Sequence, residues 1–231
     1  MSNNTNALDL YAKIEDLIGV KEVAPKLQAY YFDILKELNF NSLLDIGCGS
    51  GDFLKEVQKK FNIKTLGIDK SPKMVELARK NNINAIKAEI FDINKKFDVA
   101  TAVFDMLNYL PPNEFIKFFE HLKTITNYFI FDLNTSYGLS ELAVGTFIAE
   151  DNNRFLAIDS YYEDGIYESD FILFEKENSC YKKSSATIFQ YYYPTNFLEL
   201  IDKWHIVKEI PLKLYDMQDF DKTIYLMQVK N

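Results

Sequence analysis

Short apolar segments alternate with amphipathic helical segments through the first 134 residues of the chain. Strands are predicted at residues 42–46, 64–69, 85–88, 97–104 and 128–133, with helices between them at 53–61, 71–80 and 112–126. Continuous apolar strands separated by helices are typical of a parallel sheet that is covered on both faces. We therefore expect ligands to bind at the carboxyl ends of these strands.

Two further regions flank this alternation. Amphipathic helices are predicted at 24–38 and, on a weaker pattern, at 8–18. After residue 133, alternating β-rich segments at 154–162, 166–175 and 181–193 predict an antiparallel sheet. A helix at 195–203 and strands at 206–214 and 223–229 then return to the first architecture.

These elements predict an α/β fold: a doubly wound, mostly parallel sheet of seven strands with an inserted antiparallel sheet. No composition shift divides the chain, so one domain is expected over residues 1–231. Its parts are N-terminal helices at 8–38, a core at 40–134, an insert at about 138–193, and a C-terminal helix and hairpin at 195–231.

Charge and composition exclude several function classes. The chain has 26 Lys and Arg against 34 Asp and Glu, and a net charge of −8 repels a nucleic-acid backbone. No window resembles a membrane span or a secretory signal, and the two cysteines form no disulfide framework, so we expect a cytoplasmic protein without a membrane partner. Two histidines do not suffice for a tri-histidine metal site, and no metal is expected.

The run from Leu43 to Gly51 carries the clearest site signal, with glycines at positions 47, 49 and 51. Glycines directly after a strand allow the backbone to turn sharply and to approach a ligand closely. A dinucleotide-binding turn needs another glycine at position 52, where this chain has Asp52. A small-molecule cofactor without a pyrophosphate is therefore favoured.

The pattern Asp45-x-Gly47-Cys48-Gly49-x-Gly51 resembles the first motif of class I S-adenosylmethionine-dependent methyltransferases. That resemblance implies a Rossmann-like methyltransferase fold, S-adenosyl-L-methionine as cofactor and S-adenosyl-L-homocysteine as product. It also implies that Asp45 and the glycine backbone hold the methionine moiety, and that Asp69, 18 residues after Gly51, binds the ribose hydroxyls. Each acid could instead be a solvated carboxylate at a strand end, but the three glycines between them favour binding.

The resemblance extends to residues that follow the second, third and fourth strands. The segment with Lys70 and Met74 is similar to the one that packs on adenine, and Glu89 and Ile90 stand where the family binds the adenine edge. The Phe104 carbonyl stands where an acceptor for the cofactor's ammonium is expected. Met74 and Phe104 could equally be core residues, and Cys48 is interpreted as a small residue that fits the loop.

Methyl transfer from a sulfonium is an in-line displacement that needs no metal and often no strong base. No catalytic residue is therefore assigned. The chain is similar to small bacterial methyltransferases with a β insert after the fifth strand, which implies a lid over a small-molecule acceptor. An oxygen on a small polar metabolite is expected, for example a bacterial surface-saccharide component, although the residues leave nitrogen open. Candidate acceptor contacts are Tyr11, Asn108, Tyr109, Asn134 and Tyr137.

Three alternatives remain open. A nicotinamide-dinucleotide oxidoreductase could use the same glycine turn, but Asp52 and the absence of a Tyr-x-x-x-Lys pattern disfavour it. A non-catalytic module that binds S-adenosylmethionine would be expected to show a damaged glycine turn, and this turn is intact. An RNA-methylating enzyme is disfavoured by the net charge. The sequence makes no prediction of oligomeric state.

Overall fold

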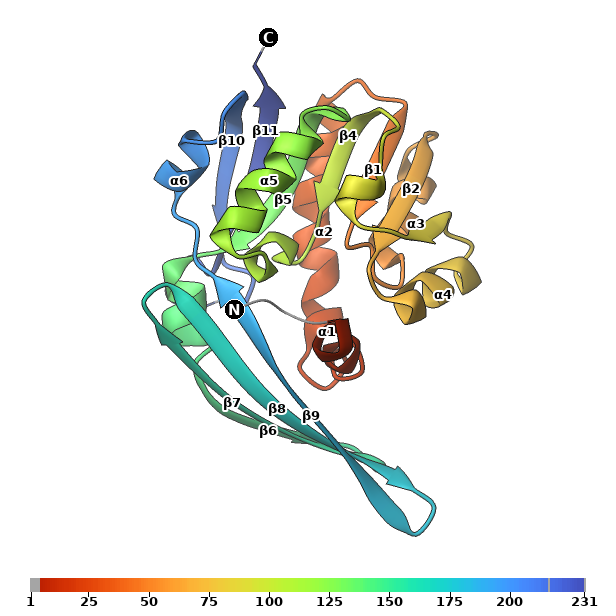
Figure 1. Ribbon diagram of the computed structural model, residues 1–231, viewed down its shortest axis with the longest axis vertical. Helices are drawn as coiled ribbons and strands as arrows, with labels where there is room; N and C mark the ends of the chain where they lie inside the picture. Colours follow the sequence, from red (N-terminus) through yellow and green to blue (C-terminus); the bar gives the residue numbers. More distant parts are fainter. Residues whose placement is uncertain (1–4, 216, 231) are drawn as a thin grey trace.

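A seven-stranded sheet in the order β10-β11-β5-β4-β1-β2-β3 forms the centre of the computed structural model, in which residues 5–215 and 217–230 are described (Figure 1). Its strands are β1 (Ser42–Ile46), β2 (Lys64–Asp69), β3 (Ala85–Lys87), β4 (Phe97–Ala102), β5 (Thr126–Asn134), β10 (Trp204–Leu212) and β11 (Lys222–Val229). Neighbouring strands from β3 to β5 pair in parallel, whereas β11 runs antiparallel to both β5 and β10. The strand order reverses between β1 and β4, which is where such sheets bind ligands.

Helices cover both faces of this sheet. One core contains residues of α2 (Val20–Glu37), α3 (Asp52–Lys60) and α4 (Pro72–Lys80), including the fully buried Tyr31 and Leu35. The other core is rich in stacked aromatic rings and lies under α5 (Pro112–Leu122) and α6 (Thr195–Glu199). Burial of both faces explains why the parallel strands read as continuous apolar runs.

The insert is a four-stranded antiparallel sheet in the order β6-β7-β8-β9, and it extends away from the carboxyl ends of the core strands (Figure 1). Its strands are β6 (Gly145–Glu150), β7 (Arg154–Glu163), β8 (Ile166–Glu177) and β9 (Cys180–Tyr191). The π-helical turn η3 (Gly138–Leu142) leads into it, and short 3-10 turns η1 (Ile90–Asp92) and η2 (Met106–Tyr109) follow β3 and β4. The first helix, α1 (Thr5–Tyr11), packs on the insert: Ala7, Leu10 and Ile14 share a cluster with Leu156, Phe171, Leu173 and Ile188.

The predicted fold class is confirmed, with differences in several of its elements. The helix predicted at 112–126 ends at Leu122 and the strand predicted at 97–104 ends at Ala102. The helix predicted at 8–18 ends at Tyr11 and continues as turns, in which Ile14 packs on the insert. The helix predicted at 24–38 begins earlier, at Val20 after the left-handed Gly19. The helix predicted at 195–203 ends at Glu199. Strand β6 was not predicted, because five of its six residues are exposed and it shows no alternation of burial.

No helix in the described parts of the chain is long and apolar enough to cross a membrane.

Candidate functional site

The glycine turn, residues 47–51, connects β1 to α3. One side of this turn is open. The N–H groups of Gly47 and Cys48 donate to the Ile68 carbonyl at 2.8 and 3.0 Å, which fixes the turn against β2. Gly51 has a φ of 82°, and a Cβ at this position would lie 2.7 Å from Ile83 Cγ1. A Cβ at Gly49 would meet no atom within 4 Å. The turn therefore packs tightly against the core on one side and leaves room for a ligand on the other.

Asp69 ends β2 and braces this turn. Its Oδ2 accepts the Gly49 N–H at 2.9 Å and its Oδ1 accepts the Ser71 N–H at 2.8 Å. Burial raises the pKa of Asp69 more than these hydrogen bonds lower it. Each carboxylate oxygen accepts more than one hydrogen bond, so Asp69 keeps capacity for two ligand hydroxyls. This geometry suits the predicted ribose site.

Asp45 is buried at the end of β1 and turns toward β4. The Thr101 hydroxyl donates to Asp45 Oδ1 at 2.7 Å. Burial raises the pKa of Asp45 to about 7; the Thr101 hydrogen bond lowers it, and the charge of Asp69 raises it further. A neighbouring cation would lower this pKa, so the group suits an ammonium ligand.

Cys48 fits the loop by size. A Cβ at Gly67 would lie 2.7 Å from Cys48 Sγ, so the thiol fills space that the neighbouring glycine leaves. Burial raises the pKa of the Cys48 thiol, which removes it as a nucleophile at neutral pH.

The residues predicted to surround adenine lie after β2 and β3. Met74 is half-buried in the first turn of α4, and its N–H donates to Ser71 Oγ at 3.2 Å. Lys70 and Glu89 form an exposed ion pair of 3.2 Å between Nζ and Oε1. Ile90 is buried at the start of η1. These four positions thus lie at the carboxyl edge of β2 and β3, as predicted.

The chain turns sharply after β4 at Phe104 and Asp105, whose φ angles of 63° and 47° are both left-handed. The buried Asp132 of β5 stabilises this corner: its two carboxylate oxygens accept the N–H groups of Phe104 and Asp105, each at 2.8 Å. The Tyr31 hydroxyl donates to the same carboxylate at 2.6 Å. The corner orients Phe104 at the ligand edge.

Two of the predicted acceptor residues meet beside this corner. Tyr11 of α1 and Tyr109 of η2 make an edge-to-face contact with ring centroids 6.5 Å apart. A side-chain hydrogen bond with Tyr109 lowers the pKa of Tyr11 in part. Burial raises the pKa of both groups, and the charge of Asp105 adds to this rise.

The other three predicted acceptor residues differ in placement. Asn134 is linked to the residues around Tyr109 through Gln190, because the Asn134 amide donates to Gln190 Oε1 at 2.9 Å. Asn108 does not line the site: it is fully buried, donates to the Tyr191 carbonyl at 2.8 Å and accepts the Asn134 N–H at 3.0 Å. Asn108 therefore holds the backbone of Asn134 from inside the core. The sequence analysis expected Asn108 itself to contact the acceptor, and its burial corrects that expectation. Tyr137 precedes η3 and, within the described residues, makes no hydrogen bond or ring contact with this group.

Four residues of the site were missed by sequence analysis. They are polar or charged residues at the ends of core or insert strands: Asp105, Asp132, Gln190 and Lys222. Lys222 is 3% exposed at the start of an apolar strand, and an isolated lysine before such a strand is a usable signal. Gln190 ends β9 among tyrosines and had no comparable signal.

Helix α1 also brings a carboxylate to the cofactor side. One side-chain oxygen of Asp9 is buried and has no hydrogen-bond partner within the described residues. The charge of Asp9 contributes to the raised pKa of Asp69, which places the two carboxylates near each other.

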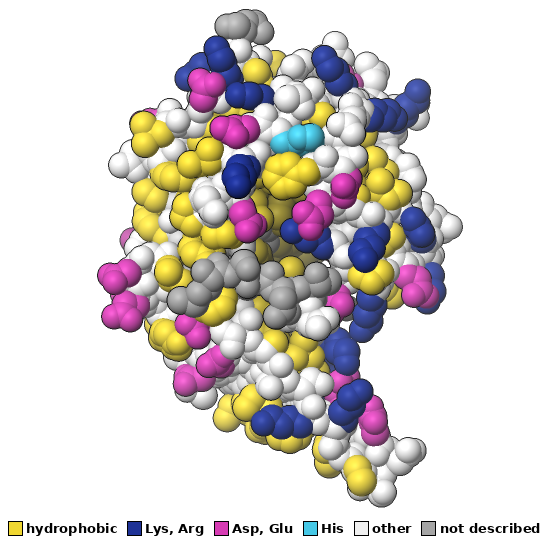
Figure 2. Space-filling model, in the orientation of Figure 1, with side chains coloured by type: hydrophobic (Ala, Val, Ile, Leu, Met, Phe, Trp, Pro, Cys, Tyr) yellow, Lys and Arg dark blue, Asp and Glu magenta, His cyan; other side chains and the backbone are white. Residues whose placement is uncertain are grey.

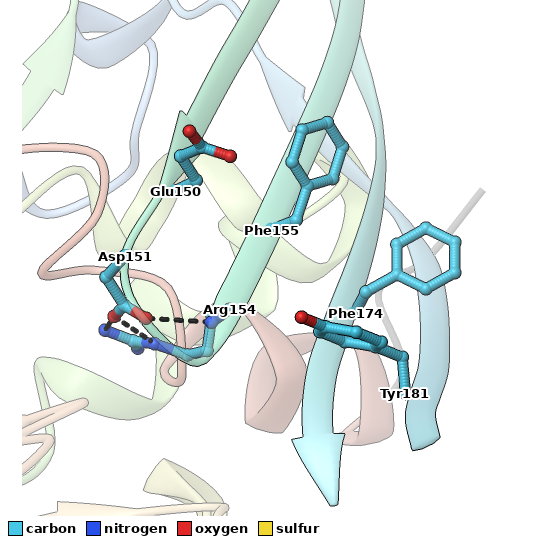
Figure 3. A pocket seen from close by; sticks show the side chains of 6 residues that line it. All are labelled: Glu150, Asp151, Arg154, Phe155, Phe174 and Tyr181. Atoms are coloured by element: carbon cyan, nitrogen blue, oxygen red, sulfur yellow. Dashed lines mark hydrogen bonds and ion pairs between the residues drawn. The ribbon is translucent and has the colours of Figure 1, made fainter. Parts of the chain in front are cut away.

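Two hollows lie near the insert. One of about 200 Å³ is lined by Asn134, Tyr192, Tyr193, Thr223 and their neighbours, at the end of β5. The other, of about 470 Å³, is lined by residues of the insert that include Arg154, Phe155, Phe174 and Tyr181 (Figure 3). Figure 2 shows apolar side chains recessed between core and insert, with charged side chains of both signs around them.

Comparison with known proteins finds a family similarity in the part of the chain that holds this site. Residues 43–127, which hold the glycine turn, Asp69 and the corner after β4, match a family described as a methyltransferase domain. This match agrees with the methyltransferase resemblance of the glycine-turn motif. S-adenosylmethionine, the methyl donor expected from the sequence, is bound in the solved structure of one similar protein, CalS10. No curated protein sequence matches the chain.

Solved structures share the enzyme's fold over nearly its whole length. An S-adenosylmethionine-dependent methyltransferase from Clostridium acetobutylicum ATCC 824 has a TM-score of 0.80 and 21% identity, covering 96% of this chain and 98% of that chain. The sugar N-methyltransferase KedS8 from Streptoalloteichus sp ATCC 53650 has a TM-score of 0.75 and 15% identity, over 100% and 94%. CalS10, an amino pentose methyltransferase from Micromonospora echinaspora, has a TM-score of 0.63 and 14% identity, over 98% of both chains.

Proposed function

We propose that the enzyme transfers a methyl group from S-adenosylmethionine to an amino nitrogen of a polar, saccharide-sized small molecule. The donor supplies an electrophilic methyl group on a sulfonium. The protein therefore has to bind the donor and the acceptor, align the methyl group with the acceptor atom, and exclude water. Asp45, the glycine turn and Asp69 bind the donor in this proposal, and Tyr11 and Tyr109 face the acceptor.

The observation that carries the proposal is the carboxylate of Asp105 beside the Tyr11–Tyr109 pair. Methylation of an amine moves positive charge from the sulfonium to the acceptor nitrogen. A fixed negative charge where positive charge arrives stabilises that transition state. Asp105 directly precedes η2, the turn that carries Tyr109, and its charge contributes to the raised pKa of both tyrosines.

Nitrogen replaces the oxygen predicted from sequence for a second reason. A hydroxyl acceptor reacts faster with a base near neutral pKa, whereas an amine needs only to arrive neutral. The pKa values of Tyr11 and Tyr109 are raised well above their usual value, so neither tyrosine serves as that base. His121 is engaged elsewhere, with its Nε2 2.9 Å from the Ile93 carbonyl. The names of KedS8 and CalS10, a sugar N-methyltransferase and an amino pentose methyltransferase, support the same acceptor class.

The insert and α1 together form the proposed lid over the acceptor, and residues 1–231 work as one unit in this proposal. The net charge of −8 and the mixed charges around the recess in Figure 2 favour a small molecule over a nucleic acid.

Matched acceptors test this function. Amino sugars and the corresponding hydroxy sugars, free and nucleotide-linked, are incubated with enzyme and S-adenosylmethionine, and products are measured by mass spectrometry. We expect methylated amino sugar at a rate at least about tenfold above that of its hydroxy counterpart. Methylation of the hydroxy sugars alone would contradict the nitrogen proposal and restore the oxygen prediction.

A further inference from the structure

Lys222 is a buried lysine whose ammonium is surrounded by acceptors. Its Nζ lies 2.5 Å from Asp105 Oδ1, 2.8 Å from Asn134 Oδ1 and 3.1 Å from Asp132 Oδ2. Burial lowers the pKa of Lys222, but Asp105 and Asp132 raise it more, so the group stays charged. One positive charge thus lies between two carboxylates at the start of β11.

The two carboxylates have different tasks. Asp132 is fully buried and accepts the N–H groups of the left-handed Phe104 and Asp105. Left-handed backbone in two consecutive non-glycine residues is costly and persists only where its surroundings enforce it. Lys222 offsets the charge that Asp132 needs for this purpose, and therefore stabilises the corner indirectly.

Asp105 connects the same ammonium to the insert. Its Oδ1 contacts Lys222, and its Oδ2 accepts from Gln190 Nε2 of β9 at 2.6 Å. Gln190 in turn accepts from Asn134 Nδ2. The carboxylate that faces the tyrosine pair is thus oriented from one side by the core and from the other by the insert.

We propose that Lys222 is a positioning residue for methyl transfer, acting through Asp105 to orient the acceptor-facing carboxylate and through Asp132 to fix the corner at Phe104. This inference rests on the proposed acceptor site but adds a residue that does not itself touch the acceptor. Without the ammonium, two carboxylates lie unscreened next to each other and separate by repulsion. The corner then loosens, and Asp105 turns away from the tyrosines.

Four variants test the proposal. Lys222→Met keeps the length of the side chain and removes its charge, and Asp105→Asn keeps the shape of the carboxylate and removes its charge. The double variant removes both charges, which reduces the repulsion that could prevent Lys222→Met from folding. Lys208→Met is the matched control. It removes a partly exposed lysine of the neighbouring strand β10, and this lysine pairs with Glu37 of α2.

The first measurement needs no acceptor. Amide hydrogen exchange is followed by NMR in the complex with S-adenosylhomocysteine. In Lys222→Met we expect the Phe104 and Asp105 amides to exchange at least about tenfold faster, while the Ile130 and Phe131 amides of β5 stay as slow as in the wild type. Asp105→Asn and Lys208→Met leave all four amides unchanged. Unchanged exchange at Phe104 and Asp105, or an equal rise at all four amides, would overturn the positioning role.

The second measurement uses an acceptor that the wild type methylates. Lys222→Met and Asp105→Asn should each raise the acceptor KM at least about tenfold with a smaller change in kcat, and the rise in the double variant should be smaller than the product of the two single rises. Multiplicative losses in the double variant, or a wild-type KM in Lys222→Met, would overturn action through Asp105. If the wild type methylates no amine, the proposed function fails, and the exchange measurement alone decides the role of Lys222.

Discussion

Asp45 is a carboxyl group whose proton is held more tightly in the folded chain than in the unfolded chain. Burial raises its pKa to about 7 from an ordinary value of 3.8. Its stabilising effect is therefore present in full below about pH 4, declines as pH rises toward 7, and is absent above that pH. A shift of this size corresponds to about 4 kcal/mol in the free energy of unfolding.

Asp45→Asn should remove this decline, because an amide does not titrate. Free energies of unfolding without cofactor, measured in urea between pH 4 and 8, should fall with pH in the wild type and fall less steeply in the variant. Asp33→Asn, which changes a carboxylate with a 71% exposed side chain, serves as control and should keep the wild-type slope. Equal slopes in Asp45→Asn and wild type would show that Asp45 titrates normally.

Helix α1 and the turns that follow it are attached to the insert more than to the core. Beyond the shared apolar cluster, Arg154 of β7 donates to the Lys13 carbonyl at 2.8 Å and to Asp16 Oδ2 at 2.6 Å. Asp151 accepts from the same guanidinium, as Figure 3 shows, and Lys13 pairs with Glu175 at 2.7 Å. These contacts make α1 and the insert a single covering element that carries Tyr11 to the site.

Arg154→Met should loosen this covering element without unfolding the core. Exposed ion pairs are weak, and a multiply bonded guanidinium contributes about 1 kcal/mol. Hydrogen exchange in peptides covering residues 7–18 should therefore rise about fivefold, with core peptides unchanged. Lys36→Met, which breaks an exposed helical pair with Asp33, should alter neither region. Wild-type exchange at 7–18 in Arg154→Met would mean that the apolar cluster alone holds α1.

At the scale of the whole molecule, several groups at the carboxyl edge of the sheet together determine which cofactor fits. The glycine turn and Asp69 fit an adenosyl group with a free amino acid, whereas the exposed Asp52 at the start of α3 would repel a pyrophosphate. Calorimetric titration should show binding of S-adenosylhomocysteine and none of NAD. Saturation at a hundredfold excess over Kd should stabilise the fold by about 2.7 kcal/mol, seen as a rise in Tm.

Asp69→Ala is the control for that titration. It should lower the affinity for S-adenosylhomocysteine by at least tenfold, because charge-assisted hydrogen bonds to the ribose are lost. Its circular dichroism spectrum should stay that of the wild type. NAD binding by the wild-type enzyme, or unchanged S-adenosylhomocysteine affinity in a folded Asp69→Ala, would contradict the cofactor site.

The prediction of a cofactor side rests on local patterns. A strand, a glycine turn and a helix within residues 42–61 are set by neighbouring residues, because backbone turning and apolar periodicity act over a few positions. The same holds for Asp69 and for the segment after it. The insert was predicted in part: β7, β8 and β9 bury residues on one face, whereas the edge strand β6 buries none and left no pattern.

The proposed acceptor side depends on residues that lie far apart in the chain. Five separate parts of the chain bring together Tyr31, Asp105, Asp132, Gln190 and Lys222. The charges of the two carboxylates are compensated by the one ammonium between them. Asn108 was expected at the surface of the site, yet its packing between β5 and β9 buries it. Glycine turns and strand-end acids follow from local backbone chemistry, whereas buried charges are compensated only by partners that the tertiary fold supplies.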